Sequence, residues 1–162
     1  MIKNDRQYDV TKAQAQKFAK ALQGFAKGKS VQSMHPALAK AQREAIKSQY
    51  EELQQELKTY EDLKKGKRKT IRVNSFVHLP AALIQARIAR GFTQKDLAHR
   101  LGLNEQQIQR YEASSYAKAS LHRINQIIAV LDIKIGGKVD LTNGNANRAS
   151  ARLRRTSMNF AQ

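Results

Sequence analysis

The sequence predicts an all-α protein, and three observations lead to this prediction. Apolar residues recur every three or four positions through much of the chain, which is the spacing of an amphipathic helix. Residues 37–64 contain no Gly or Pro, so one long helix can run through them. Residues 79–132 show a dense pattern of short apolar runs that are separated by glycines and capping residues.

The first helix is expected to begin at Thr11, because Thr11 and Gln14 have the spacing of a capping box. Gly24 and Gly28 frame its expected end, and residues 28–34 are expected to form a loop. One apolar face follows at helical spacing and consists of Ala15, Phe18, Ala19, Leu22 and Phe25.

The second helix is expected to begin near Pro36, which suits a first turn, and to end at Lys64. It carries a heptad-like apolar seam of Ile46, Tyr50, Leu53, Leu57 and Tyr60. The first helix is the simplest partner for this seam, but it is expected to be only about half as long. We therefore expect the distal part of the seam, near Leu57 and Tyr60, to meet a second copy of the chain or another protein.

The basic run KKGKRK at residues 64–69 marks the expected domain boundary. Residues 1–65 are expected to form a helical module for dimerisation or partner binding, and residues 66–78 a basic linker. Residues 79–139 form the second domain, and residues 140–162 a flexible basic tail. A minor two-stranded β element is a weaker expectation, from Thr70–Val73 and from Ile133, Ile135 and Val139.

The second domain is expected to contain short helices with defined ends. Pro80 opens a helix that stops at Gly91, and Thr93 with Asp96 caps the next. Gly102 breaks that helix, and Asn104 with Gln107 is expected to cap a third. A fourth helix is expected to carry one apolar side, which consists of Leu121, Ile124, Ile128 and Leu131.

Residues 91–112 have the pattern of a helix-turn-helix. Ala98 is small where the helices would cross, and Gly102 suits a left-handed turn. The residues expected to point inward are Leu97, Leu101, Leu103, Ile108 and Tyr111. The opposite face then presents Gln106, Gln109, Arg110 and Ala113, and Glu105 lies in the first turn.

These residue types suit the reading of base edges, because Gln pairs with adenine, Arg with guanine and Glu with cytosine. Glu105, Gln106 and Arg110 are the candidate base contacts. Gln94, at the start of the preceding helix, and Lys118, in the loop before the fourth helix, are candidate phosphate contacts.

The composition supports a polyanionic partner and no enzyme. The net charge is +17, and segments 1–70, 71–140 and 141–162 carry +8, +5 and +4. The alternative is a basic surface that only maintains solubility.

The chain has no Cys, and the four His have no ligand spacing, so neither a metal nor another cofactor is expected. The segment GFAKGKS, residues 24–30, falls one residue short of a P-loop. With no apolar run of about 20 residues and no signal-peptide pattern, the chain is expected in the cytoplasm, at the nucleoid, and not in a membrane.

Residues 80–131 resemble the Cro/C1-type (XRE) helix-turn-helix family, and the run GLNEQQIQRYEASSYAKASLHRI resembles HigA-like antitoxins. IKNDRQYDVTKAQAQKF and the long helix after His35-Pro36 resemble a subset of the same regulators. The resemblance implies a five-helix DNA-binding domain. It also implies recognition through Glu105, Gln106 and Arg110, with Gln94, Asn104 and Gln107 near phosphates.

Three functions remain open on this basis. The first is a dimeric, sequence-specific repressor that binds double-stranded DNA and controls its own operon. The second is an antitoxin that neutralises a cognate toxin through residues 1–65. The third is a sequence-tolerant architectural DNA binder that uses its net charge and the arginines of the tail, which are Arg148, Arg152, Arg154 and Arg155.

Overall fold

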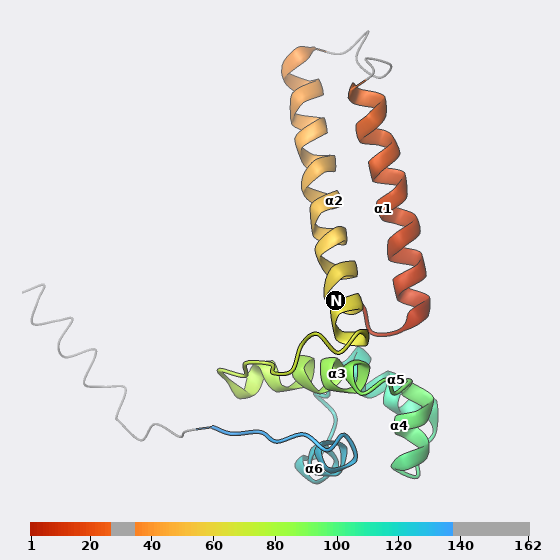
Figure 1. The fold of residues 1–162 in the computed structure, drawn as a ribbon, viewed down its shortest axis with the longest axis vertical. Coiled ribbons are helices and arrows are strands. Elements are labelled where there is room, and N and C mark those ends of the chain that lie inside the picture. Colours follow the sequence, from red (N-terminus) through yellow and green to blue (C-terminus); the bar gives the residue numbers. More distant parts are fainter. Residues whose placement is uncertain (27–34, 138–162) are drawn as a thin grey trace, which may run out of the picture.

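The computed structural model describes residues 1–26 and 35–137 (Figure 1). These residues form α1 (Asp5–Ala26), α2 (Pro36–Lys64), the 3-10 helix η1 (Phe76–His78), α3 (Leu79–Ala89), α4 (Gln94–Arg100), α5 (Glu105–Ala113) and α6 (Leu121–Val130). The described part is helical, as the sequence predicts, and it contains no strand. Residues 79–137 hold four α-helices, so the implied count of five is not confirmed. The expected basic tail lies outside the described residues.

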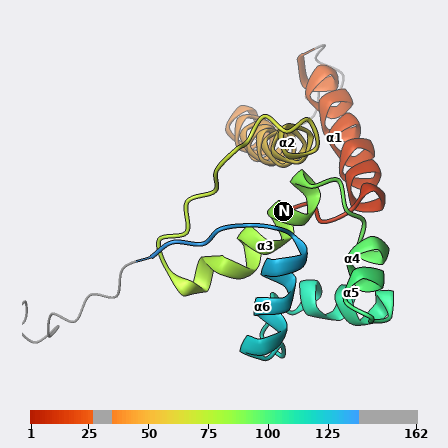
Figure 2. The same ribbon diagram turned by 60° about the horizontal axis from the view of Figure 1, so that its bottom comes forward.

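The two long helices form an antiparallel hairpin, and one end of this hairpin rests on the short helices (Figure 1). α3 lies beneath that end, with α4 and α5 to one side of it and α6 on its other face (Figure 2). The hairpin is therefore docked on the second domain and not held away from it by an extended linker.

The start of α1 corrects the first expectation, because the helix begins at Asp5 and not at Thr11. Asn4 is the capping residue: its Oδ1 accepts a hydrogen bond from the backbone N–H of Gln7 at 2.9 Å. The Gln7 side chain in turn accepts one from the N–H of Lys3 at 2.9 Å. Thr11 lies one and a half turns inside the helix. With 22 residues against 29 in α2, α1 is well over half as long as its partner.

α2 spans the predicted residues, with Pro36 in its first turn. His35 precedes it, and its Nδ1 accepts a hydrogen bond from the N–H of Ala37 at 3.3 Å. The chain leaves α2 through Gly66, which has a φ of +65°. Left-handed backbone of this kind is the usual way for a helix to end at a glycine.

The distal part of the seam is covered by the chain itself. Leu57 and Tyr60 are buried, and so is Leu63, which the sequence analysis missed. Tyr8 of α1 stacks on Tyr60 with ring centroids 5.4 Å apart. The expectation that Leu57 and Tyr60 meet a second copy or another protein is therefore wrong, because α1 begins early enough to cover them. Ile46, Tyr50 and Leu53 are half-buried, and their role as a partner surface stays a prediction.

Polar contacts close the same end of the hairpin. The Tyr8 hydroxyl donates a hydrogen bond to Glu61 at 2.7 Å, and the Tyr60 hydroxyl donates one to Asp5 at 3.0 Å. Lys64 also pairs with Asp5 at 2.6 Å. Burial, followed by the neighbouring Asp5 carboxylate, raises the pKa of Tyr60, and the Lys64 hydrogen bond lowers the pKa of Asp5. Asp5, Glu61 and Lys64 therefore each have a partner at this end.

One hydrophobic cluster joins the hairpin to the short helices. Its buried members include Ile2, Leu57 and Leu63 from the hairpin side, together with Leu83, Ile84, Leu97, Ile108 and Ile127 from the second domain. Because these side chains are contiguous, the two parts share a core, and the packing of one supports the other.

Two further expectations need correction. Residues 70–73 and 133–135 form no strand, and Val139 lies outside the described range. Both segments line a hollow beside α3, and no strand pairing is formed between their described residues. In α6, Leu121 is exposed because it directly follows the cap residue Ser120, and Ile127 is buried in the apolar stripe with Ile124 and Leu131.

The shared core predicts that a cavity under the hairpin destabilises the whole described fold. Leu63 is 1% exposed, so Leu63→Ala should lower the free energy of unfolding by about 2–5 kcal/mol. Leu38→Ala, on the same helix at a site 59% exposed, should change it by less than about 0.5 kcal/mol. Urea unfolding followed by circular dichroism measures both, and two separate transitions in the wild type would contradict a single core.

Candidate nucleic-acid interface

The helix-turn-helix is built from α4 and α5, and its turn follows the predicted chemistry. Ala98 and Leu97 are buried in α4, and Ile108 is fully buried in α5. Gly102 has a φ of +65°, and the N–H of Leu103 donates to the carbonyl of Ala98 at 2.9 Å, which closes the end of α4. The turn therefore sets the angle between the two helices through backbone geometry.

The start of α4 has the predicted capping box. Thr93 accepts a hydrogen bond from the N–H of Asp96 at 3.0 Å, and the Asp96 carboxylate accepts one from the N–H of Thr93 at 2.8 Å. These hydrogen bonds from the Thr93 side chain and backbone lower the pKa of Asp96, so the carboxylate stays ionised and the cap stays formed to a lower pH than with an unperturbed Asp.

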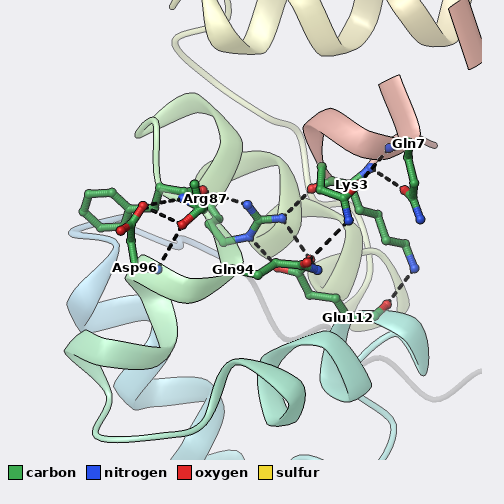
Figure 3. Close-up of polar contacts among 9 residues, drawn as sticks. Lys3, Gln7, Arg87, Gln94, Asp96 and Glu112 are labelled. Carbon is green, nitrogen blue, oxygen red and sulfur yellow. Dashed lines mark hydrogen bonds and ion pairs between the residues drawn. The ribbon is translucent and has the colours of Figure 1, made fainter. Parts of the chain in front are cut away.

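A buried ion pair links α3 to α5 (Figure 3). Arg87 is 2% exposed and Glu112 is 0% exposed. The guanidinium donates to both carboxylate oxygens of Glu112, with Nη2 at 2.9 Å from Oε2. Its remaining donors reach the carbonyls of Phe92 and Lys3, each at 2.7 Å. Since every charged atom has a partner, this burial is tolerated.

The sequence analysis missed this pair, although the sequence carries a signal for it. Arg87 lies among Leu83, Ile84 and Ile88, on a helix that is apolar almost all round. Glu112 follows the inward Ile108 by four residues, which places it on the same buried face of α5. Two opposite charges at core positions of neighbouring helices indicate a buried pair.

Gln94 does not lie where the sequence analysis expected it. Its side chain is buried, its Nε2 donates to Glu112 at 2.7 Å, and its Oε1 accepts from Asn4 at 3.4 Å. The amide is therefore occupied inside the protein. The expectation that it holds a phosphate is corrected for this structure, because Glu112 and Asn4 take its hydrogen-bonding groups.

The outer face of α5 presents the expected residues to solvent. Glu105, Gln106, Gln109 and Arg110 are all exposed. Gln109 donates a hydrogen bond to Glu105 at 3.0 Å, one turn away. The side chains of Gln106 and Arg110 make no hydrogen bond or ion pair with any residue that the structure describes, so both are available to a ligand.

A shallow hollow runs along one flank of this face, from the start of α5 to the loop that follows it. It brings together predicted base and phosphate contacts, and its lining consists of Asn104, Gln106, Gln107, Arg110, Tyr111, Ala113, Ser114 and Lys118. Gln107 donates to the Tyr111 hydroxyl at 3.1 Å. Asn104 precedes α5 as expected, but its side chain makes no capping hydrogen bond, so the predicted capping box with Gln107 is wrong.

The loop after α5 is anchored by an aromatic residue. Ser115 and Tyr116 have φ values of +49° and +58°, a backbone conformation that is uncommon for residues other than glycine. Tyr116 is buried and stacks on Tyr111 with ring centroids 6.1 Å apart. Burial raises the pKa of its hydroxyl. This anchor fixes the loop and leaves the exposed Lys118 at the rim of the hollow.

A helix-turn-helix family model matches residues 83–137, which contain most of α3 and all of α4, α5 and α6. The chain therefore contains a DNA-binding domain of the Cro/C1 type, and such a domain indicates a transcription regulator. This fold is generally non-enzymatic. No curated protein and no solved structure matches the chain, and the HigA-like resemblance is not confirmed. Within residues 1–26 and 35–137, no helix combines the length and apolarity needed to cross a bilayer.

The buried pair predicts a double-mutant result. Glu112→Leu leaves a buried guanidinium without its counter-charge and should cost about 3–5 kcal/mol, and Arg87→Met should cost a comparable amount. The double variant Arg87→Met/Glu112→Leu should lose less than the sum of the two, because no charge is left unpaired.

Lys65→Met is the control, since it breaks the exposed pair with Glu61 and should cost less than about 1 kcal/mol. Urea unfolding measures all four variants. If the losses of the two single variants simply add in the double variant, the two charges are not coupled.

Proposed function

We propose that this protein is a homodimeric repressor that binds a specific double-stranded DNA site by inserting α5 into the major groove. The observation that carries the proposal is the outer face of α5, where Gln106 and Arg110 are exposed and free of internal partners. A face built from long hydrogen-bonding side chains and ending at the small Ala113 suits close approach to base edges.

The residues have distinct roles in this proposal. Arg110 donates two hydrogen bonds to a guanine, and Gln106 pairs with an adenine at a neighbouring position. Glu105 accepts from a cytosine amino group, and Gln109 holds the Glu105 carboxylate in place. Lys118, Asn104 and Gln107 lie along the hollow beside α5 and contact the phosphate backbone there.

A dimer follows from the size of the reading helix. α5 has nine residues and is therefore only about 13 Å long, so one copy reads a few base pairs. Two copies on half-sites about 34 Å apart provide a longer site and a symmetric one. We place this dimer in the cytoplasm, at the nucleoid. When it binds the promoter of its own operon, it represses that operon.

The repressor is preferred over the two alternatives. The antitoxin function was favoured by a seam that needed an external partner, and Leu57 and Tyr60 of that seam are already covered by the chain. An architectural binder would need only charge, and it does not account for the uncharged Gln106 beside Arg110 on the reading face.

Selection from a random duplex library with the full-length protein tests the proposal. We expect one enriched, inverted-repeat site. On that site, Arg110→Ala and Gln106→Ala should each cost about 1–3 kcal/mol and relax the preference at one base pair per half-site.

The control is Arg43→Ala, which removes an exposed arginine from α2 about 30 Å along the helix from Lys64 and should leave base preference unchanged. Normal discrimination by folded Arg110→Ala and Gln106→Ala proteins would show that α5 does not read the bases. A library without an enriched site would favour the architectural binder.

A further inference from the structure

The segment directly before α1 is fixed to α3 and to the helix-turn-helix (Figure 3). The carbonyl of Lys3 accepts from Arg87, and the Lys3 Nζ donates to the carbonyl of Glu112, each at 2.7 Å. Asn4 donates to Gln94 at 3.4 Å and also caps α1 through Gln7. The residues that follow Asn4 therefore occupy a defined place beside α4 and α5.

Arg6 is the unpaired cation at this place. It lines two adjoining hollows between the start of α1 and the helix-turn-helix, and Gln94 and Gln109 line both of them. Its neighbour Asp5 is bound by Lys64, but Arg6 is exposed and has no ion pair or hydrogen bond to a side chain among the residues described. A guanidinium free of internal partners is available for an external anion.

α5 has one flank on each side of its outer face, and a different cationic side chain lies beside each flank. Gln107 and Gln109 point about 200° apart around the helix, so they lie on nearly opposite flanks. Lys118 lies at the flank of Gln107, in the hollow described above. Arg6 lies at the flank of Gln109. The flank of Gln109 is also where Gln94 was expected to bind a phosphate, and that amide is occupied by Glu112 and Asn4.

A helix in the major groove has a phosphate backbone on each side. The groove is about 12 Å wide and a helix with its side chains is about 10–12 Å across, so both walls pass within side-chain reach. One wall meets the flank with Lys118. The other meets the flank with Arg6. Glu105 also lines that hollow, but its carboxylate is bound by Gln109, so the free guanidinium of Arg6 is the group that can pair with a phosphate oxygen.

We propose that Arg6 of α1 binds the DNA phosphate backbone on the α5 flank opposite Lys118, so that the first turn of the hairpin is part of the DNA interface. This inference rests on the proposed function, since it requires α5 to lie in the major groove. The contact is made to phosphate and not to a base, so it strengthens binding to every sequence by the same factor.

The test compares full-length variants on the selected duplex and on a scrambled duplex of the same length, over a series of salt concentrations. Arg6→Ala should weaken binding to both duplexes several-fold and by the same factor. It should also reduce the slope of log affinity against log salt by about 0.9 per chain, the value for one phosphate contact. Arg6→Lys keeps the charge and should retain the slope.

Two controls separate the contact from other effects. Arg43→Ala also removes an arginine side chain, but from a part of α2 far from α5, and should leave the slope unchanged. Gln7→Ala removes a hydrogen bond at the start of α1 without removing a charge, and it should also leave the slope unchanged. If Gln7→Ala reproduces the effect of Arg6→Ala, the effect is structural and the inference is wrong.

Other outcomes also overturn the inference. An unchanged slope for Arg6→Ala shows that no phosphate contact exists, and a rise in affinity shows that Arg6 obstructs the interface. A loss confined to the selected duplex shows a base contact instead. If Arg110→Ala loses discrimination while Arg6→Ala is silent, the proposed function stands and only this inference fails. If Arg110→Ala is silent, the reading role of α5 fails independently of the result for Arg6.

Discussion

The buried ion pair between Arg87 and Glu112 determines how the helices of this protein are placed. Taking both charges out of water is costly, and the cost is offset only if the guanidinium and carboxylate find all their partners at once. Those partners come from α3, α4, α5, the turn before α4 and the segment before α1. The hydrophobic cluster supplies most of the stabilisation, but apolar contacts are tolerant of small shifts. The ion pair is directional, and we infer that it favours a single arrangement of these helices.

The docking of the hairpin depends on this network as well. The Lys3 carbonyl accepts a hydrogen bond from Arg87, and the Lys3 ammonium donates one to the carbonyl of Glu112. The segment before α1 therefore completes the hydrogen bonding of a site inside the second domain. Burial of Ile2, Leu57 and Leu63 in the common core acts in the same direction. The basic linker can then be irregular, because the position of the hairpin is set by contacts and not by the linker.

The sequence predicted the parts of the fold that are governed by local chemistry. Pro36, Gly91, Gly102 and the Thr93–Asp96 box each act within one turn of helix, and each lies where it was expected. The start of α1 was misplaced because Thr11–Gln14 and Asn4–Gln7 both have the spacing of a cap. The structure uses Asn4, whose neighbour Lys3 is also bound by Arg87.

The candidate site was predicted to the same extent and for the same reason. The exposed face of α5 follows from helical periodicity once Ile108 is placed inward, so the exposure of Gln106 and Arg110 was predicted, and their role as base contacts stays a prediction. Gln94 was misjudged because its partners, Asn4 and Glu112, are 90 and 18 residues away in the chain. Spacing within one helix carries no information on such partners. The burial of Leu57 and Tyr60 was missed because it depends on where α1 begins.

The common core has a thermodynamic consequence for any ligand of the hairpin. If DNA binds only the form in which the first turn of α1 is docked, DNA and a hairpin ligand become linked through the docking equilibrium. A ligand that prefers the docked form then tightens DNA binding, and DNA tightens the binding of that ligand by the same factor. A ligand that separates Lys3 from Glu112 has the opposite effect and acts as an inducer. Under that condition the hairpin would be an allosteric input, and the segment before α1 would transmit its state to α5.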